Sequence, residues 1–146
     1  MDDTQIYFAY GSNLHRHQMR VRCPTSVPLR RCMLPGWRLL FRECADIVRH
    51  TGSVVHGALY SVRDADIAEL DAYEGVEHGL YGRAETQAGG LAVFFYVMDP
   101  AFFVQPPEEN YFAVIRQGFL DWQLPMESLE SARRHAIKHT GWRPAG

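Results

Sequence analysis

The sequence predicts an α+β domain in which helices flank a small mixed β-sheet or barrel. Segments typical of β-strands dominate the first two thirds of the chain and helical patterns dominate the last third, so the two kinds of element are segregated. The 146 residues, 47% of them hydrophobic and 22% charged, suit a single domain over residues 1–146 with its own hydrophobic core. No repeat, low-complexity tract or linker divides the chain.

The first strand is expected over Ile6–Tyr10, whose residues are aromatic or apolar. Gly11 permits a tight turn after it, and Ser12 or Asn13 is expected to cap a short helix over residues 14–21. A junction of this kind directs unpaired backbone N–H groups to one place, where a carboxylate or an oxyanion can bind. Taken alone, the pattern favours the simpler interpretation of a helix start after a core strand.

Several strands are expected next, with a turn at Pro35-Gly36 between the first two. Their expected ranges are 28–34, 37–41, 45–48 and 54–62. Gly57 interrupts the last of them, which indicates a bulge or a close approach of the backbone to a ligand.

A helix is expected to begin at Asp64, its cap, and to end at Tyr73 or Glu74, because Gly75 stands where a glycine commonly follows a helix. Glu74 shares one face of this helix with two apolar residues at positions i and i+3, so we expect its side chain to point inward. Apolar surroundings and the nearby helix C-terminus both raise the pKa of such a carboxyl group toward that of a general base. The alternative is an exposed glutamate on a frayed last turn.

A hairpin of strands 81–87 and 91–98 is expected around Gly89-Gly90. The second strand is apolar on both faces and is therefore expected to be covered on both sides. After a loop over residues 100–107, helices are expected over 110–122 and from Pro125 to about His139, before Gly141. The apolar stripe of the first of these helices is assigned to core packing; its members are Tyr111, Val114, Ile115, Phe119 and Trp122.

Composition and charge exclude several classes of protein. A net charge of −2 gives no attraction to nucleic acid or to a membrane surface, and no apolar segment is long enough to span a bilayer. Arginines crowd the first third and acidic residues the middle; we interpret these as solvated faces, with attraction of an anionic substrate as the alternative. No signal peptide is expected after the opening Met-Asp-Asp-Thr.

Metal and nucleotide sites are not expected either. The three cysteines lack a Cys-x-x-Cys pattern, which indicates reduced thiols and a cytoplasmic protein rather than a disulfide framework or a zinc site. His135 and His139 have the i, i+4 spacing of metal ligands but no third ligand beside them, so they are expected at the surface. No Gly-x-Gly-x-x-Gly or Walker-type lysine supports a nucleotide cofactor.

The segment Tyr10-Gly11-Ser12-Asn13-Leu14 resembles the signature of the γ-glutamylcyclotransferase family, which has the AIG2-like fold. A second block of that family is matched by Leu70-Asp71-Ala72-Tyr73-Glu74-Gly75, followed by Tyr81, in the same order and at a fitting separation. The resemblance continues through Gly52–Tyr60, Tyr96, Pro106-Pro107 and Leu124-Pro125, and therefore covers nearly the whole chain.

The resemblance implies a closed, barrel-like sheet and an enzyme that cleaves a γ-glutamyl amide by cyclisation, releasing 5-oxoproline and an amine or amino acid. It implies Glu74 as the catalytic general acid and base, a small γ-glutamyl substrate, and neither a cofactor nor a metal. Implied substrate-binding positions are Tyr7, Tyr10, Gly11, Ser12, Asn13, Leu14, Tyr81 and Tyr96. From the residues alone, Tyr96 is better interpreted as a core tyrosine, and Tyr81 is equally interpretable as a packing residue.

Two alternatives remain at this point. One is a cyclotransferase variant that unmasks a γ-glutamyl-protected natural product or an isopeptide. The other is a domain without catalytic activity that binds a small metabolite or a protein. The chain is expected to be a monomer or a homodimer, with Trp122 or Trp142 as an exposed dimer contact.

Overall fold

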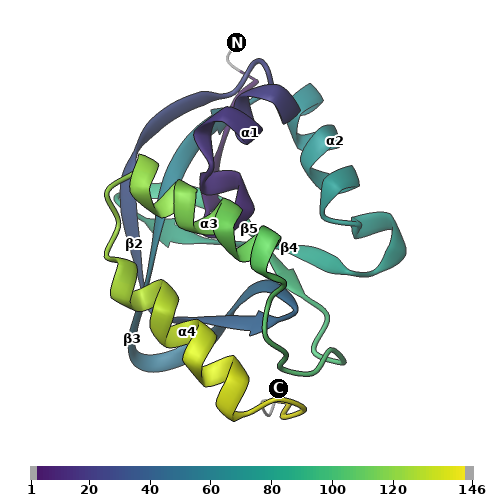
Figure 1. The fold of residues 1–146 in the computed structure, drawn as a ribbon. Coiled ribbons are helices and arrows are strands. Elements are labelled where there is room, and N and C mark those ends of the chain that lie inside the picture. The colour runs from purple at the N-terminus through teal and green to yellow at the C-terminus, as the bar shows by residue number, and fades with distance from the viewer. Residues whose placement is uncertain (1–2, 144–146) are drawn as a thin grey trace.

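The computed structural model describes residues 3–143 and contains a five-stranded sheet with four α-helices (Figure 1). The strands are β1 (Gln5–Ala9), β2 (Val27–Arg42), β3 (Cys44–Val62), β4 (Tyr81–Ala88) and β5 (Leu91–Met98). The helices are α1 (Arg16–Arg22), α2 (Asp64–Tyr73), α3 (Glu109–Asp121) and α4 (Met126–Lys138), with short 3₁₀ turns η1 (Ser12–Leu14) and η2 (Val76–His78). The predicted α+β class is confirmed.

β1 lies at the centre of the sheet, whose order is β2-β3-β1-β5-β4. It pairs antiparallel with β3, where Tyr7 faces Tyr60, and parallel with β5, where Tyr7 faces Phe94. The remaining pairs are antiparallel, so the sheet is mixed as predicted. Because β1 is central, the turn that follows it opens at the middle of one sheet edge.

The expected closure of the sheet into a barrel is wrong. β2 and β4 occupy the two ends of the strand order, and within residues 3–143 no strand pairing joins them. A side chain bridges the gap at one point, where an Arg30 nitrogen donates to the Gly89 carbonyl oxygen at 2.6 Å. The sheet curls far enough for that contact but does not close.

The expected short strands of the first half form one long hairpin, in which β2 pairs with β3 from Val27 to Arg42. Pro35-Gly36 is not a turn: the register shifts between Pro35 and Trp37, and Gly36 takes a φ of 83° at this bulge. A glycine is required at position 57 because the backbone of β1 approaches closely there, and not because a ligand does: an added Cβ would lie 2.4 Å from the Ala9 carbonyl oxygen.

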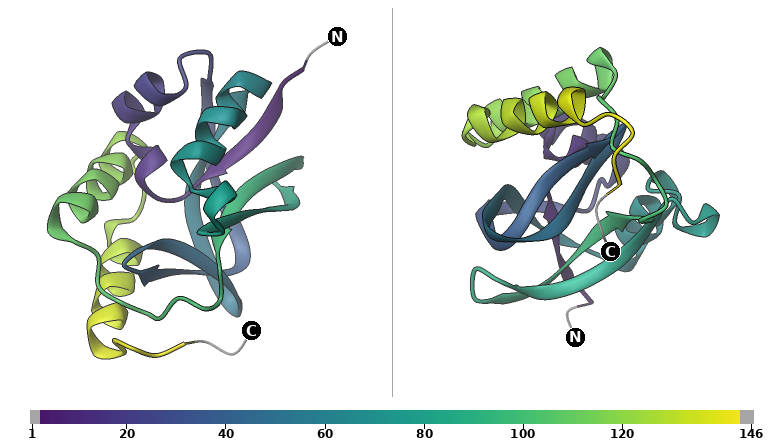
Figure 2. Two further views of the ribbon diagram at one scale, coloured as in Figure 1. Left: turned by 90° about the vertical axis from the view of Figure 1, so that its right-hand side faces the viewer. Right: turned by 90° about the horizontal axis from the view of Figure 1, so that it is seen from below.

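The helices occupy separate places around the sheet. α3 and α4 lie together on one side of the β2–β3 hairpin, whereas α2 stands apart, near the N-terminal end of the chain (Figures 1 and 2). α1 is capped by His15, whose Nδ1 accepts from the Gln18 N–H at 3.2 Å, and not by Ser12 or Asn13. Asp64 is the first residue of α2 rather than its cap, because Arg63 holds that position.

Helix α3 carries the expected apolar stripe into the core, where Ile115 and Phe119 are buried. Trp122 is also buried, and its indole N–H donates to the Leu14 carbonyl oxygen at 3.0 Å, so its expected exposure for a dimer contact is wrong. Trp142 is exposed.

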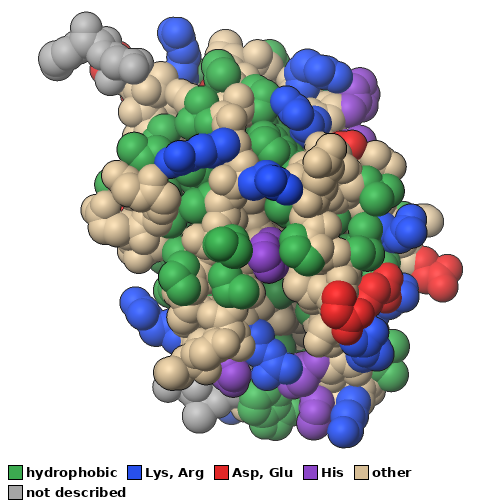
Figure 3. Space-filling view, turned by 90° about the vertical axis from the view of Figure 1, so that its left-hand side faces the viewer, with side chains coloured by type: hydrophobic (Ala, Val, Ile, Leu, Met, Phe, Trp, Pro, Cys, Tyr) green, Lys and Arg blue, Asp and Glu red, His purple; other side chains and the backbone are tan. Residues whose placement is uncertain are grey.

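On the face drawn in Figure 3, lysine and arginine side chains are scattered among apolar and polar ones rather than gathered into one patch. No helix between residues 3 and 143 combines the length and the apolar character needed to cross a membrane.

Candidate active site

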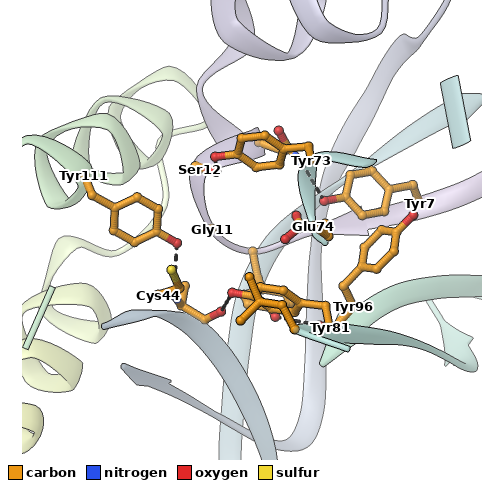
Figure 4. Close-up of a pocket in the computed structure, with 13 residues that line it drawn as sticks. Tyr7, Gly11, Ser12, Cys44, Tyr73, Glu74, Tyr81, Tyr96 and Tyr111 are labelled. Atoms are coloured by element: carbon orange, nitrogen blue, oxygen red, sulfur yellow. Dashed lines mark hydrogen bonds between the residues drawn. The ribbon is translucent and has the colours of Figure 1, made fainter. Parts of the chain in front are cut away.

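A cavity of about 230 Å³ opens where the end of β1 meets α2, β3, β4, β5 and α3 (Figure 4). Six of its thirteen lining residues are tyrosines, and a single one, Glu74, carries a charged type of side chain. The lining consists of Tyr7, Tyr10, Gly11, Ser12, Asn13, Cys44, Ala45, Tyr73, Glu74, Leu80, Tyr81, Tyr96 and Tyr111.

Glu74 follows the last residue of α2 and directs its carboxyl group into the cavity (Figure 4). Gly75 takes the left-handed conformation after it, with a φ of 63°, and so ends the helix at this position. Burial raises the pKa of the Glu74 carboxyl group from 4.5 to about 7, although the positive charge of Arg22 acts in the opposite direction. The group can therefore both accept and donate a proton near neutral pH.

The loop after β1 contributes Gly11, Ser12 and Asn13 to the lining of the cavity. The Leu14 N–H donates to the Gly11 carbonyl oxygen at 3.0 Å, which tightens η1, while the N–H groups of Ser12 and Asn13 have no backbone acceptor among residues 3–143. Gly11 has a φ of −123°, so its place is not explained by a left-handed turn. It is explained by contact, since an added Cβ would lie 3.2 Å from the Ala45 Cβ.

Two side chains of this loop are held by tyrosines. The Asn13 amide donates to the Tyr7 hydroxyl at 3.0 Å, and the Ser12 hydroxyl lies 2.9 Å from that of Tyr73, within hydrogen-bond distance. Leu14 does not line the cavity; it is fully buried beneath the loop, against α3. The other predicted site positions in the loop are thus brought together with Glu74, and Leu14 is not.

The predicted tyrosines also converge here. The Tyr10 hydroxyl donates to the Tyr96 carbonyl oxygen, the Tyr81 hydroxyl to the Ala45 carbonyl oxygen, and the Tyr96 hydroxyl to Asp71 Oδ1 at 2.6 Å. Burial raises the pKa of all three phenols above the ordinary 10, so they remain neutral donors near pH 7.

The sequence did not identify five of the lining residues as site positions: Cys44, Ala45, Tyr73, Leu80 and Tyr111. Tyr111 lies on the stripe that was assigned to core packing, yet its hydroxyl reaches the cavity and accepts from the Ala45 N–H at 2.9 Å. Tyr73 stands beside Glu74 in the matched block, which was the available signal for it.

Within residues 3–143, no three histidine, cysteine or acidic side chains are grouped closely enough to hold a metal ion. His135 and His139 stack with ring centroids 4.5 Å apart, and Trp142 packs beside both of them.

Fold and cavity together define an α+β protein with a glutamate in a tyrosine-lined pocket. Its family follows from a match over most of the chain: the model of the family described as Gamma-glutamyl cyclotransferase, AIG2-like, matches residues 7–122. The chain belongs to this family.

Relatives and solved structures agree with that assignment. The chain is 27% identical to Gamma-glutamylcyclotransferase of Mus musculus, over 90% of this chain and 78% of the relative, and 26% identical to that of Homo sapiens, over 90% and 79%. A structure of a Gamma-glutamyl cyclotransferase superposes with a TM-score of 0.80 at 24% identity, covering 89% of this chain and 86% of the other. YkqA from Bacillus subtilis superposes with a TM-score of 0.74, also at 24% identity, over 99% of this chain and 57% of the other. These likenesses to solved structures concern the fold.

Proposed function

We propose that this protein is an enzyme that cleaves a γ-glutamyl amide by cyclisation, releasing 5-oxoproline and an amine or amino acid. The observation that carries the proposal is the Glu74 carboxyl group, which faces the tyrosine-lined cavity and has a pKa raised to about 7 by burial. Membership of the family and the names of the relatives support the same reaction class.

The reaction needs a base and a folded substrate. The α-amino nitrogen of the substrate attacks its own γ-carbonyl carbon; the new C–N bond closes a five-membered ring, and the original amide C–N bond breaks. An α-amino group is largely protonated at neutral pH, since its reference pKa is about 7.7–8.0. Glu74 takes a proton from that nitrogen, which frees its lone pair for attack, and passes the proton to the departing nitrogen. The second proton that the attacking nitrogen loses on ring closure also leaves with the amine, which departs as an ammonium ion, so no water and no protein nucleophile is consumed.

The cavity supplies the remaining requirements. A cavity volume of about 230 Å³ restricts a flexible glutamyl chain to folded conformations, and this restriction removes part of the entropic barrier to ring closure. The Ser12 and Asn13 N–H groups, free of backbone acceptors among residues 3–143, are suited to hold the substrate carboxylate or the developing oxyanion.

A panel of γ-glutamyl compounds tests the proposal, with 5-oxoproline release measured by chromatography. The panel contains γ-glutamyl amino acids, a γ-glutamyl-ε-lysine isopeptide and γ-glutamyl amides of larger amines, so that it includes the variant substrates considered above. We expect 5-oxoproline from at least one class. Binding without 5-oxoproline from any class would instead favour a domain that only binds small molecules.

A further inference from the structure

Arg22 ends helix α1 and stands between two elements that line the cavity. Its guanidinium donates to the Asn13 side-chain oxygen, and its Cζ lies 3.4 Å from the centroid of the Tyr73 ring. Asn13 in turn donates to the Tyr7 hydroxyl, and the Tyr73 hydroxyl lies within hydrogen-bond distance of Ser12. One side chain therefore joins α1, the loop after β1 and the end of α2.

Arg22 is also the charged neighbour that acts on Glu74. Its positive charge opposes the effect of burial and lowers the pKa of the Glu74 carboxyl group. Burial raises the pKa of each titratable group that faces Glu74 from the other elements, so these groups are neutral near pH 7. They are Tyr7, Tyr10, Cys44, Tyr81, Tyr96 and Tyr111.

The other charges near the cavity compensate each other. Asp71, which accepts from the Tyr96 hydroxyl, lies 3.8 Å from the Arg83 Nε. An acid and a base so close produce a small net field at a distance. The field on Glu74 therefore comes mainly from Arg22.

We propose that Arg22 is a positioning residue of this site: it ties the loop of Ser12 and Asn13 to Tyr73 and keeps a positive charge beside the Glu74 carboxylate. A planar guanidinium suits both tasks, because it donates through a rigid fork and stacks on an aromatic face, whereas lysine supplies charge alone. The kinetic consequences rest on the proposed function; the effect of the Arg22 charge on the titration of Glu74 does not depend on it.

Three variants separate the two tasks. Arg22→Gln removes the charge, and Arg22→Lys keeps the charge but loses the planar fork. Arg20→Gln is the matched control, since Arg20 is exposed on the same helix and its guanidinium contacts the ring of His17.

In Arg22→Gln we expect the acidic limb of the kcat/KM profile to move to higher pH, because the ionised form of Glu74 loses its stabilising charge. We also expect KM to rise by ~10-fold, on the scale of a lost charge-assisted hydrogen bond. Arg22→Lys should show the same rise in KM, but the acidic limb of its kcat/KM profile should stay at the parental pH. Arg20→Gln should alter neither quantity.

A ¹³C NMR titration of the Glu74 carboxyl group, assigned with Glu74→Gln, gives a readout that does not need catalysis. Its midpoint should lie higher in Arg22→Gln than in the parent. An unchanged midpoint with an unchanged KM in a folded Arg22→Gln protein overturns the proposal. If melting curves show that Arg22→Gln is unfolded, Arg22→Lys carries the test, and a parental KM in that variant overturns it. Failure of the proposed function has a different signature, since the parent protein would then release no 5-oxoproline from any γ-glutamyl compound, whereas the NMR midpoint of Glu74 would still report on the effect of Arg22.

Discussion

At the scale of single residues, the lining of the candidate site contains one carboxyl group, in surroundings that solvate its charge poorly. The Glu74 pKa of about 7 lies close to that of the amine from which it would take a proton, so transfer in either direction is nearly balanced. A glutamate at its ordinary pKa of 4.5 would be a much weaker base at the same pH.

Glu74→Gln should keep the shape of the side chain and remove the base. We expect turnover, measured as 5-oxoproline release, to fall by about 10²–10⁴-fold while a substrate analogue still binds in calorimetry. Glu77→Gln is the control, because Glu77 lies three positions further on, is exposed in η2 and does not line the cavity. Near-parental turnover in Glu74→Gln would remove Glu74 as the general base.

The same carboxyl group should make stability depend on pH. Its folded pKa of about 7 exceeds the unfolded value near 4.5, so the folded state holds the proton more tightly between those values. Its contribution is complete below pH 4.5 and is lost as pH rises through 7, because the charged form is poorly solvated. The melting temperature of the parent should therefore fall relative to that of Glu74→Gln across this window. Parallel curves for the two proteins would contradict a raised pKa of the Glu74 carboxyl group in the folded state.

The inward direction of Glu74 was predictable because it follows from helical spacing to two apolar neighbours. Tyr73 and Tyr111 were not, for different reasons. The Tyr73 side chain is exposed to solvent, yet its hydroxyl lies within hydrogen-bond distance of Ser12. Tyr111 belongs to the apolar stripe of α3, but its hydroxyl accepts from the Ala45 N–H. Both depend on contacts between segments far apart in sequence, which periodicity does not describe. The catalytic and binding roles themselves remain predictions.

At the scale of elements, helix α3 holds the loop after β1 in place by close contact. Gly118 faces that loop, and an added Cβ would lie 2.5 Å from the Leu14 Cβ and 2.7 Å from the His15 nitrogen. The Leu14 side chain is buried and the Leu14–His15 backbone is fixed, so neither can move away from an added Cβ easily. The absence of a side chain at Gly118 therefore sets the distance between α3 and the loop.

Gly118→Ala should therefore destabilise the protein by about 1–3 kcal/mol through overpacking, although alanine is the better helix former. The displaced loop should also bind substrate more weakly. Denaturant unfolding and KM measure the two effects. Gly82→Ala is the control, since its added Cβ would meet nothing within 4 Å. Unchanged stability and KM in Gly118→Ala would show that the loop does not depend on this contact.

Local patterns predicted the elements that end on clear signals. α2 ends before Gly75, and β4 and β5 meet at Gly89-Gly90, both of which have positive φ as a tight hairpin requires. The prediction wrongly divided β2 into two strands, because Pro35-Gly36 has the composition of a turn. In the structure these residues form a bulge within the continuous pairing of β2 with β3. Whether a sheet closes depends on the curvature of all its strands, and no local pattern records that.

At the scale of the whole molecule, a buried ion pair joins the turn of the β2–β3 hairpin, where β2 ends and β3 begins, to the rest of the fold. Arg42 Nε donates to Asp46 Oδ2 at 2.8 Å, and both side chains are at most 4% exposed. Asp46 Oδ1 also accepts from the Met98 N–H at 2.9 Å, and Arg42 donates to the Phe102 carbonyl oxygen. The pair thus connects the hairpin to β5 and to the loop after it.

Asp46→Asn should cost about 3–5 kcal/mol of unfolding free energy, because it leaves a buried guanidinium without its counter-charge. Glu127→Gln is the comparison, since the ion pair of Glu127 with Arg134 is 76% and 60% exposed and should contribute at most ~1 kcal/mol. Guanidinium unfolding curves give both values. Equal effects of the two substitutions would mean that burial does not strengthen the Arg42–Asp46 pair.

The open sheet leaves β2 as an edge strand, with consequences for self-association. Val27, Leu29 and Met33 are exposed on it, and an apolar strand with free backbone groups invites pairing with a second copy of the chain. Arg30 and Arg31 interrupt that surface, and their guanidinium groups bind the carbonyl oxygens of Gly89 and Gln123. Charged side chains on an edge strand disfavour its pairing with another chain, so these two arginines place on β2 the kind of residue that opposes self-association.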